Sequence, residues 1–235
     1  MSETSDITDS TLLLIPGLLC DRVVWEPLLQ TLSGKAVVAD LSAQNSLTQM
    51  AEDQLAQFDG SLIVIGHSMG ARVAMEIARL APDRVQKLVL MDTGIHPLAE
   101  GETEKRQRMI RLAHEQGMQA LAEQWLPGMV SEPNRRDTRL MQTLTDMVLR
   151  KDADLHERQI TALINRPDAT AYLATIHCPT LLVVGRDDQW SPVSQHEDMQ
   201  KLLPHSTLEI IEDAGHFAPL EQPERVCRVV ECFLA

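Results

Sequence analysis

Short apolar runs alternate with longer amphipathic stretches along most of this chain. The apolar runs occupy residues 11–15, 36–39, 62–65, 88–91, 180–184 and 207–211, and the amphipathic stretches occupy residues 47–58, 71–80, 193–203 and 225–233. Because the runs are short and rich in β-branched and aliphatic residues, they predict buried parallel strands. Regular strand–helix alternation requires crossovers that place helices on both faces of a sheet. The pattern therefore predicts an α/β fold with a doubly wound, mostly parallel sheet of about six strands.

The alternation breaks once, between residues 95 and 174, where no strand pattern occurs. Residues 102–116, 118–125, 132–150 and 154–165 have helical spacing instead, with glycines and prolines between them. Ordinary crossover helices are one interpretation, but about 80 residues is several times what one crossover needs. We therefore predict a core of residues 1–94 and 175–235 and a helical cap inserted at residues 95–174.

The charge balance argues against nucleic acid and membrane partners. The chain of 235 residues has 21 lysines and arginines against 34 acidic residues, and this net charge of −13 repels phosphate backbones and acidic lipids. Residues 1–10 are polar and acidic, unlike a secretory signal, and no run reaches the roughly 18 apolar residues of a membrane span. We expect a cytoplasmic protein.

The four cysteines carry no motif. Cys20, Cys178, Cys227 and Cys232 have neither the paired spacing of a metal or redox site nor the density of a disulfide framework. We expect reduced thiols and no metal site.

One segment has the pattern of an activated serine. Residues 61–65 form a predicted strand, Gly66-His-Ser-Met-Gly70 follows directly, and residues 71–79 are helical. A serine held between a strand and a helix in this way has a strained backbone and an exposed hydroxyl, and glycines are needed because the two elements pass closely. An ordinary strand-to-helix turn is the alternative. We predict that Ser68 is a nucleophile.

Two backbone amides are candidates for an oxyanion hole. The helix after Ser68 directs its N-terminal dipole and the free amide of Met69 toward the reacting centre. The loop of residues 14–20 follows an earlier strand, and Gly17 in it permits a bend that turns the amide of Leu18 inward. We predict Met69 and Leu18 as the two donors.

A serine nucleophile needs a base, and the base needs an orienting carboxylate. His216 lies in a loop just past the last predicted strand, while Asp187 and Asp188 follow the preceding strand. All three therefore lie at carboxyl ends of strands, where sites in open α/β sheets form. We predict His216 as the base and one of the two aspartates as the acid. We interpret the other histidines as solvated or structural, including His67, which belongs to the serine turn.

The order serine, aspartate, histidine on such a sheet resembles the α/β-hydrolase family over nearly the whole chain. The matching motifs are Gly66-His-Ser-Met-Gly70, Gly185-x-x-Asp188-x-x-x-Pro192, Asp213-Ala-Gly-His216 and Gln222-Pro-Glu224. The resemblance implies that the acid is Asp188, with Asp187 left to a surface ion pair with Arg186 or elsewhere. It implies no metal and no organic cofactor.

Two features depart from the family's pattern. Many members carry His-Gly in the oxyanion loop, where this chain has Pro16-Gly17. The two antiparallel strands that often open the fold are also absent from the pattern, because the ten residues before Thr11 are mostly polar. We therefore expect every strand to be parallel.

The resemblance implies a serine hydrolase with a small-molecule substrate. Similar capped members are carboxylesterases, lactonases, thioesterases and C–C bond hydrolases, whereas dehalogenases and epoxide hydrolases carry aspartate at the position of Ser68. We expect hydrolysis of carboxylic esters with small to medium acyl or alcohol groups through an acyl-enzyme. A C–C bond hydrolase or lyase and a lactonase or thioesterase with the same triad stay open as alternatives. So do a triad-bearing ligand sensor and a noncatalytic interaction protein.

Side chains beside these segments are candidates for substrate contacts. They are Trp25, Trp125, Met129, Trp190 and Phe217, and core packing is the alternative for each. A roof of methionine and leucine from the cap would suit acyl or alkyl groups.

Overall fold

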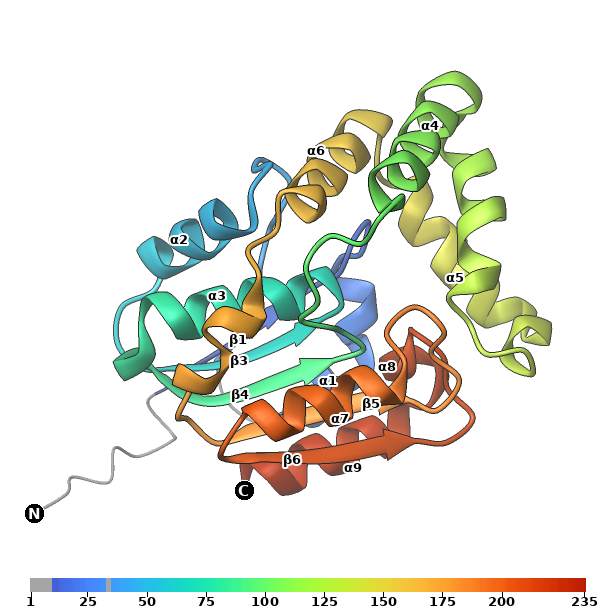
Figure 1. Cartoon of the computed structure of the whole chain (residues 1–235). Coiled ribbons are helices and arrows are strands. Elements are labelled where there is room, and N and C mark those ends of the chain that lie inside the picture. Colours follow the sequence, from blue (N-terminus) through green and yellow to red (C-terminus); the bar gives the residue numbers. More distant parts are fainter. Residues whose placement is uncertain (1–9, 33–34) are drawn as a thin grey trace, which may run out of the picture.

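A parallel sheet runs through the centre of the computed structural model, which describes residues 10–32 and 35–235 (Figure 1). Within those residues the sheet has six strands in the order β2-β1-β3-β4-β5-β6, and every neighbouring pair is parallel. The strands are β1 (Thr11–Ile15), β2 (Ala36–Val38), β3 (Leu62–His67), β4 (Val85–Met91), β5 (Thr180–Gly185) and β6 (Ser206–Ile211). The predicted fold class is confirmed, including the parallel direction of all six strands.

The strand order reverses beside β1. The chain passes from β1 to β2 on one side and then returns to β3 on the other, where Ile15 of β1 pairs with Gly66 of β3. Open α/β sheets bind ligands outside the carboxyl ends of their strands at such a reversal. The loop after β1 and the turn after β3 therefore lie beside each other at the expected place for a site.

Helices cover both faces of the sheet. One face carries α1 (Glu26–Thr31) and α9 (Pro223–Leu234), which pack against each other. The opposite face carries α2 (Leu47–Gln57), α3 (Met69–Leu80) and α7 (Val193–Leu202). Side chains alternate between these two cores along a strand, as Leu12 and Leu14 of β1 face the first and Leu13 and Ile15 the second.

The connection from β4 to β5 is helical, in agreement with the pattern of residues 95–174. It contains α4 (Glu102–Trp125), α5 (Thr138–Leu149) and α6 (Ala153–Ile164), and α4 packs against the other two. The expected break at residue 117 is confirmed, because Gly117 takes a non-helical φ of 86° and ψ of 171° and two helical segments of α4 meet there at a kink. In Figure 1 helices α4 and α5 stand apart from the layers around the sheet, whereas α6 lies close to α2 and α3. Ile160, Ala162 and Leu163 of α6 belong to the same core as those two helices. The division into core and cap stays a prediction, and residues 1–9 and 33–34 of the expected core lie outside the described residues.

One helix starts later than the sequence pattern predicts, and two short helices were not predicted. The helix expected from residue 132 begins at Thr138, because the carboxylate of Asp137 caps it by accepting from the amides of Arg139 and Leu140. Helix α1 was not expected at all, since it spans only six residues, Glu26–Thr31. The helix α8 (Ala218–Glu221) was not predicted either, because it is too short to show a helical pattern.

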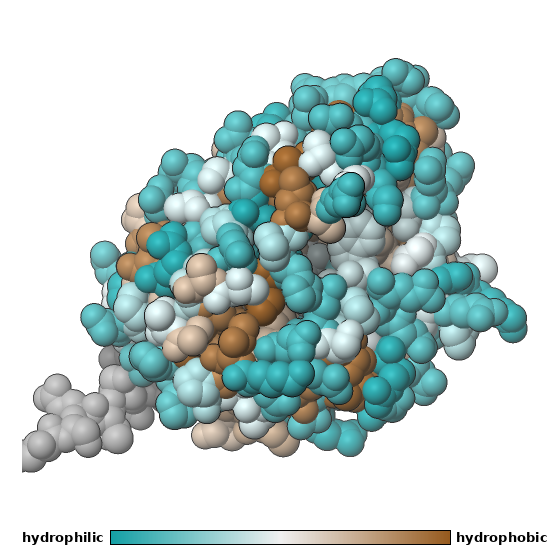
Figure 2. All heavy atoms as spheres, viewed as in Figure 1, coloured by the Kyte–Doolittle hydropathy of each residue, from teal (hydrophilic) through white to brown (hydrophobic). Residues whose placement is uncertain are grey.

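The surface in Figure 2 is mostly hydrophilic, with apolar atoms gathered in separate small patches. No helix in residues 10–32 and 35–235 combines the length and apolar character that a bilayer crossing requires.

Candidate active site

Ser68 lies between β3 and α3 in a strained backbone conformation. Its φ of 56° and ψ of −117° are rarely adopted by residues other than glycine, a strain of about 1–3 kcal/mol that the surroundings must hold in place. Its amide donates to the carbonyl oxygen of Met91 at 2.8 Å, and its own carbonyl accepts from Thr93 Oγ1 at 3.0 Å. Strand β4 and the residues just after it therefore fix the serine turn.

The two glycines of the turn allow the close packing that holds it. A Cβ on Gly66 would lie 2.5 Å from the Cα of Ala71, and one on Gly70 would lie 2.1 Å from the carbonyl oxygen of Ile15. No side chain fits at either distance, so helix α3 can pass this close to β1 and β3 only with glycine there. This confirms the steric reason for the sequence motif.

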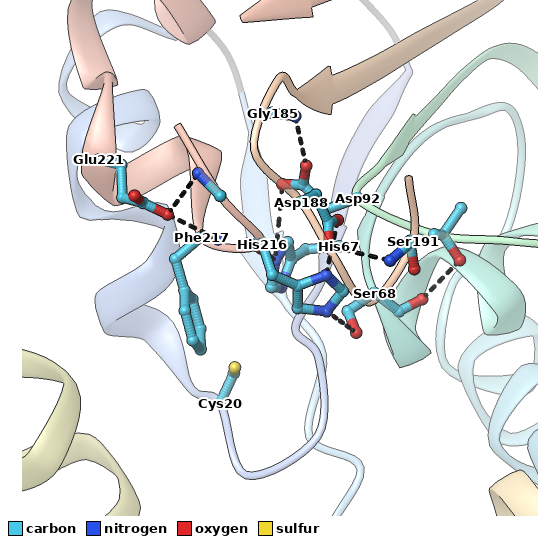
Figure 3. A network of polar contacts seen from close by, with 12 residues as sticks. Cys20, His67, Ser68, Asp92, Gly185, Asp188, Ser191, His216, Phe217 and Glu221 are labelled. Atoms are coloured by element: carbon cyan, nitrogen blue, oxygen red, sulfur yellow. Dashed lines mark hydrogen bonds and ion pairs between the residues drawn. The ribbon is translucent and has the colours of Figure 1, made fainter. Parts of the chain in front are cut away.

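The structure brings Ser68, His216 and Asp188 together from three separate loops (Figure 3). His216 Nε2 lies 2.8 Å from Ser68 Oγ, and His216 Nδ1 lies 2.8 Å from Asp188 Oδ2. In this arrangement the imidazole can take the serine proton on Nε2 while the carboxylate holds the proton on Nδ1.

Asp188 is buried and held as a carboxylate. Its Oδ1 accepts from the amides of Trp190 at 2.8 Å and Ser191 at 2.9 Å. Burial alone would raise the pKa of Asp188, but the neighbouring His216 and these amides outweigh burial and lower that pKa below its ordinary value. Asp188 is therefore ionised near neutral pH.

The adjacent Asp187 points elsewhere. Its side chain is exposed, and its amide donates to the carbonyl oxygen of Ala214 at 2.8 Å. The expected partner Arg186 pairs with Glu212 instead, at 2.7 Å, because Glu212 stands at the end of the neighbouring strand β6. Of the two aspartates, only Asp188 contacts His216.

The two predicted oxyanion donors lie at the serine. Met69 is the first residue of α3, so its amide has no acceptor within the helix. Leu18 comes from the loop after β1, which runs so close that a Cβ on Gly17 would lie 3.0 Å from Ser68 Cβ. Within the part of the chain that the structure describes, neither amide has a protein acceptor. Both residues line the cavity that holds Ser68 and His216.

A second buried histidine and aspartate stand behind the first pair. His67 is neutral, since burial and then the nearby His216 lower its pKa to about 3. The carboxylate of Asp92 lies 3.8 Å from His67 Nε2, and its Oδ1 accepts from the amide of Gly185 at 2.9 Å. Burial first, and then the negative charge of Asp188, raise the pKa of Asp92 well above its ordinary value.

Sequence reasoning missed Glu221, which holds the loop of His216. Its Oε1 accepts from the amides of Gly215 at 2.9 Å and Phe217 at 3.2 Å, on either side of the histidine. Its Oε2 accepts from the amide of Ser131 at 2.9 Å and from Asn134 at 3.0 Å, both in the helical connection. Nothing in the sequence distinguishes this glutamate from the other acidic residues, apart from its place just before the Gln222-Pro-Glu224 motif.

The backbone of Met129 makes a second link to the same loop. Its carbonyl oxygen accepts from the amide of His216 at 2.7 Å. Gly215 can lie this close to Met129 only because glycine has no side chain. A Cβ on Gly215 would lie 2.8 Å from the carbonyl oxygen of Met129. The helical connection thus helps to position the histidine as well as covering it.

A cavity of about 480 Å³ opens at Ser68 and His216. Three of the five predicted contact residues line it, namely Trp125, Met129 and Trp190. Trp25 and Phe217 do not line it, because both are buried in the core against the ring of His67. Their rings pack against His67, next to Ser68 in the chain, and so support the serine turn.

The cavity wall is less apolar than the sequence suggested. Charged residues line it beside the apolar ones: Arg72, Glu100, Glu102, Lys105, Arg106 and Arg166. The helices were expected to contribute mainly methionine and leucine. An arginine on a solvated helix face and an arginine that faces a cavity have the same sequence pattern. Only the packing of the helices in the structure shows which of the two an arginine is.

The thiols and acidic groups form no further reactive centre in the described residues. All four cysteines are free, and burial, with the charge of Asp21, raises the pKa of the Cys20 thiol to about 12. In residues 10–32 and 35–235 no group of three or more histidine, cysteine, aspartate or glutamate side chains could hold a metal ion.

Residues 12–229 match the model of a family described as "Alpha/beta hydrolase family". The chain is 28% identical over 191 residues to a putative esterase/lipase of Haemophilus influenzae, covering 79% of this chain and 66% of that protein. It is 31% identical over 177 residues to 2-hydroxy-6-oxononadienedioate/2-hydroxy-6-oxononatrienedioate hydrolase 2 of Pseudomonas putida, covering 73% and 62% respectively. The chain thus spans slightly less than two thirds of each of these two relatives.

Solved structures show the same fold. A thermophilic esterase from Thermogutta terrifontis, solved with malate bound, superposes with a TM-score of 0.87 at 29% identity, over 97% of this chain and 90% of that one. The enol-lactonase from Burkholderia xenovorans also gives a TM-score of 0.87, at 19% identity, over 99% and 93% of the two chains.

Proposed function

The chain belongs to the alpha/beta hydrolase family, and on that premise we propose that it is a serine hydrolase of carboxylic esters with small to medium acyl or alcohol groups. The observation that carries the proposal is the pair of 2.8 Å contacts that join Ser68 to His216 and His216 to Asp188. The esterase relatives from Haemophilus and Thermogutta support the same class of substrate.

The reaction follows from these contacts. Ser68 Oγ attacks the ester carbonyl while His216 Nε2 takes the serine proton, and the Asp188 carboxylate stabilises the imidazolium that forms. The amides of Met69 and Leu18 donate to the oxygen that becomes negative. His216 then gives the proton to the leaving alcohol, and an acyl group remains on Ser68. Water attacks this acyl-enzyme with His216 again as base, which releases the acid and restores the serine.

The cavity sets the size of the substrate. A volume of about 480 Å³ suits a ligand of modest size. We assign residues 95–174 as the cap over this cavity, because Trp125 and Met129 from that segment line it together with Ser68. With Trp190, they are the proposed substrate contacts.

Hydrolysis of a carbon–carbon bond is the second candidate. The relative from Pseudomonas putida, at 31% identity, is named as a hydrolase of 2-hydroxy-6-oxo dioates rather than of an ester. The charged side chains in the cavity wall favour this candidate over a purely apolar ester. The same serine, histidine and aspartate would serve both reactions.

The free thiols bear on where the protein works. Disulfides are typical of oxidising compartments, whereas all four cysteines here are free. We propose that the protein acts in the cytoplasm. Alkylation of the protein in freshly opened cells should modify accessible Cys232 without prior reduction.

Steady-state hydrolysis tests the proposed function. A panel of chromogenic esters of graded acyl length, with lactones and thioesters beside it, should include a substrate that the wild type turns over many times. Ser68→Ala should reduce kcat by several orders of magnitude, whereas the exposed control Ser194→Ala should not change it. A ligand sensor would show no repeated turnover of any member. Activity retained in Ser68→Ala would refute the proposal.

A further inference from the structure

Arg72 is a cation in the cavity, and no carboxylate in residues 10–32 and 35–235 forms an ion pair with it. It lies on α3, one helical turn after Ser68, and lines the same cavity as Ser68 and His216. Its side chain is partly buried, and its hydrogen bond within the described residues runs from Nη2 to the carbonyl oxygen of His96, at a long 3.4 Å.

Two further arginines line the same wall, and they share one carboxylate. Arg106 Nε donates to Glu102 Oε1 at 2.7 Å. Arg166 donates to both oxygens of Glu102, at 2.9 Å and 2.8 Å. Both arginine side chains are nearly inaccessible to solvent. The amide of Ala99 also donates to Glu102 Oε2, at 3.1 Å, so each oxygen of Glu102 already accepts two hydrogen bonds and none is left for Arg72.

The inner wall therefore has an excess of positive charge. Three guanidinium groups there face one carboxylate, and the two remaining charges, on Glu100 and Lys105, are exposed and opposite in sign. Burial first, and then repulsion from Arg166 and Arg106, lower the pKa of Arg72 to about 9. A partly buried cation without a partner is unfavourable, and an anionic ligand would relieve it.

The guanidinium group selects the kind of anion. Its planar donors match the two oxygens of a carboxylate and bind it in a bidentate way. Arg106 and Arg166 are already paired with Glu102, so Arg72 is the guanidinium whose donors are left for a ligand. A phosphate monoester would bring more acceptor oxygens than this one group can satisfy. The donors of Arg72 therefore fit a carboxylate better than a phosphate.

We propose that Arg72 binds a carboxylate of the substrate, so that the preferred substrate is the half-ester of a short dicarboxylic acid. This rests on the proposed function, because Ser68 must attack the ester end of the same molecule. Ser68 and Arg72 are separated by one turn, about 6 Å along the axis of α3. Both residues also line the same cavity of about 480 Å³, so one short molecule can place its ester at Ser68 and its carboxylate at Arg72.

Paired substrates test the proposal by kinetics. Monoethyl succinate and monoethyl glutarate carry the charge, and ethyl butyrate and ethyl valerate are their neutral counterparts. Wild type should have the higher kcat/KM for the charged member of each pair. Arg72→Gln should lower the ratio of charged to neutral kcat/KM by about 10- to 100-fold, the loss expected for a hydrogen-bonded charge pair. Arg72→Lys should restore part of it.

A matched control separates the local contact from the overall charge. Arg108 is exposed on α4, two residues from Arg106, and does not line the cavity. Arg108→Gln removes the same charge and should leave the ratio as in wild type. An equal fall of the ratio in both variants, or no preference for the charged esters in wild type, would overturn the proposal.

Binding to an inactive protein gives a second readout that needs no turnover. In Ser68→Ala, glutarate should raise Tm in a saturable way, and glutaramide should not. The added Arg72→Gln change should abolish the glutarate effect, and the added Arg108→Gln change should preserve it. Without ligand, Arg72→Gln should melt no lower than its parent, because it removes an unpaired cation. Stabilisation by inorganic phosphate but not by glutarate would overturn the carboxylate assignment.

The two readouts distinguish the two proposals. If no ester is hydrolysed but glutarate binding depends on Arg72, the proposed function fails and the carboxylate site stands. If esters are hydrolysed through Ser68 with no charge preference and no glutarate binding, the carboxylate site fails and the proposed function stands.

Discussion

His67 Nε2 lies 2.7 Å from the carbonyl oxygen of His216. His67, which precedes Ser68 in the chain, therefore supports the loop that carries His216. A carbonyl only accepts, and His67 is neutral with a pKa lowered to about 3 by burial and then by His216. The Nε2 atom of His67 therefore carries the proton and donates it. This contact ties the serine turn to the His216 loop across the site.

His67→Ala should weaken both folding and turnover. The change leaves a cavity beneath Trp25 and Phe217 and an unpaired carbonyl at His216, which together should cost about 2–4 kcal/mol in the free energy of unfolding. A shifted His216 should also lower kcat by at least about 10-fold. Urea unfolding and ester kinetics check these values. The exposed His205→Ala serves as control and should change stability by less than about 0.5 kcal/mol; equal effects of the two variants would refute this role.

Glu221→Gln should reduce activity through the position of His216. The carboxylate accepts from four donors, and an amide in its place would turn its own NH₂ group toward some of them. We expect kcat/KM to fall by about 10- to 100-fold and Tm to fall with it. The neighbouring exposed Glu224→Gln should leave kcat/KM at the wild-type value. If Glu221→Gln matched that control, the carboxylate would not position the loop.

Asp92 should make the protein less stable as the pH rises. Its pKa in the folded state is raised above 3.8, first by burial and then by Asp188. The folded protein therefore keeps a proton that the unfolded chain has lost, and stability decreases with pH through that window. Asp92→Asn cannot lose this proton, so its free energy of unfolding relative to wild type should increase as the pH rises above the ordinary pKa of an aspartate.

Urea unfolding at several pH values measures this difference. The control Asp83→Asn removes an exposed carboxylate and should follow the wild-type pH dependence. Parallel curves for Asp92→Asn and wild type would show that Asp92 is ionised in the folded protein.

The two adjacent aspartates should differ sharply in activity. Asp188 contacts His216 Nδ1 at 2.8 Å, whereas Asp187 is exposed. Asp188→Asn should lower kcat by about a thousandfold or more, because the imidazole loses the carboxylate that orients it. Asp187→Asn should stay close to wild type. An equal or reversed effect on ester hydrolysis would move the acid to Asp187.

Much of the fold and the central residues could be predicted because they depend on local patterns. The strands are short aliphatic runs, and the serine turn requires glycine at Gly66 and Gly70 for steric reasons that hold in any chain. The resemblance to the α/β-hydrolase family selected Asp188 over Asp187, and the contact with His216 agrees with that choice.

The remaining features depend on packing between distant segments. Trp25 and Phe217 are near the site along the chain, but their rings fill the core behind His67 instead of the cavity. Glu221 acts through amides that are up to 90 residues away, which no local pattern reveals. In the sequence Arg72 is one charge on an amphipathic helix. That it has no carboxylate partner among the described residues becomes visible only from the structure, where Glu102 pairs with Arg106 and Arg166.

Covalent labelling of Ser68 tests the central claim most directly. Wild type treated with a fluorophosphonate should gain the mass of one adduct, and peptide mass spectrometry should place it on Ser68. Ser68→Ala should gain none, and Asp188→Asn should label far more slowly than Asp187→Asn, since His216 activates the serine only when Asp188 orients it. An adduct on another residue, or equal labelling of Ser68→Ala and wild type, would contradict the assignment of Ser68 as the nucleophile.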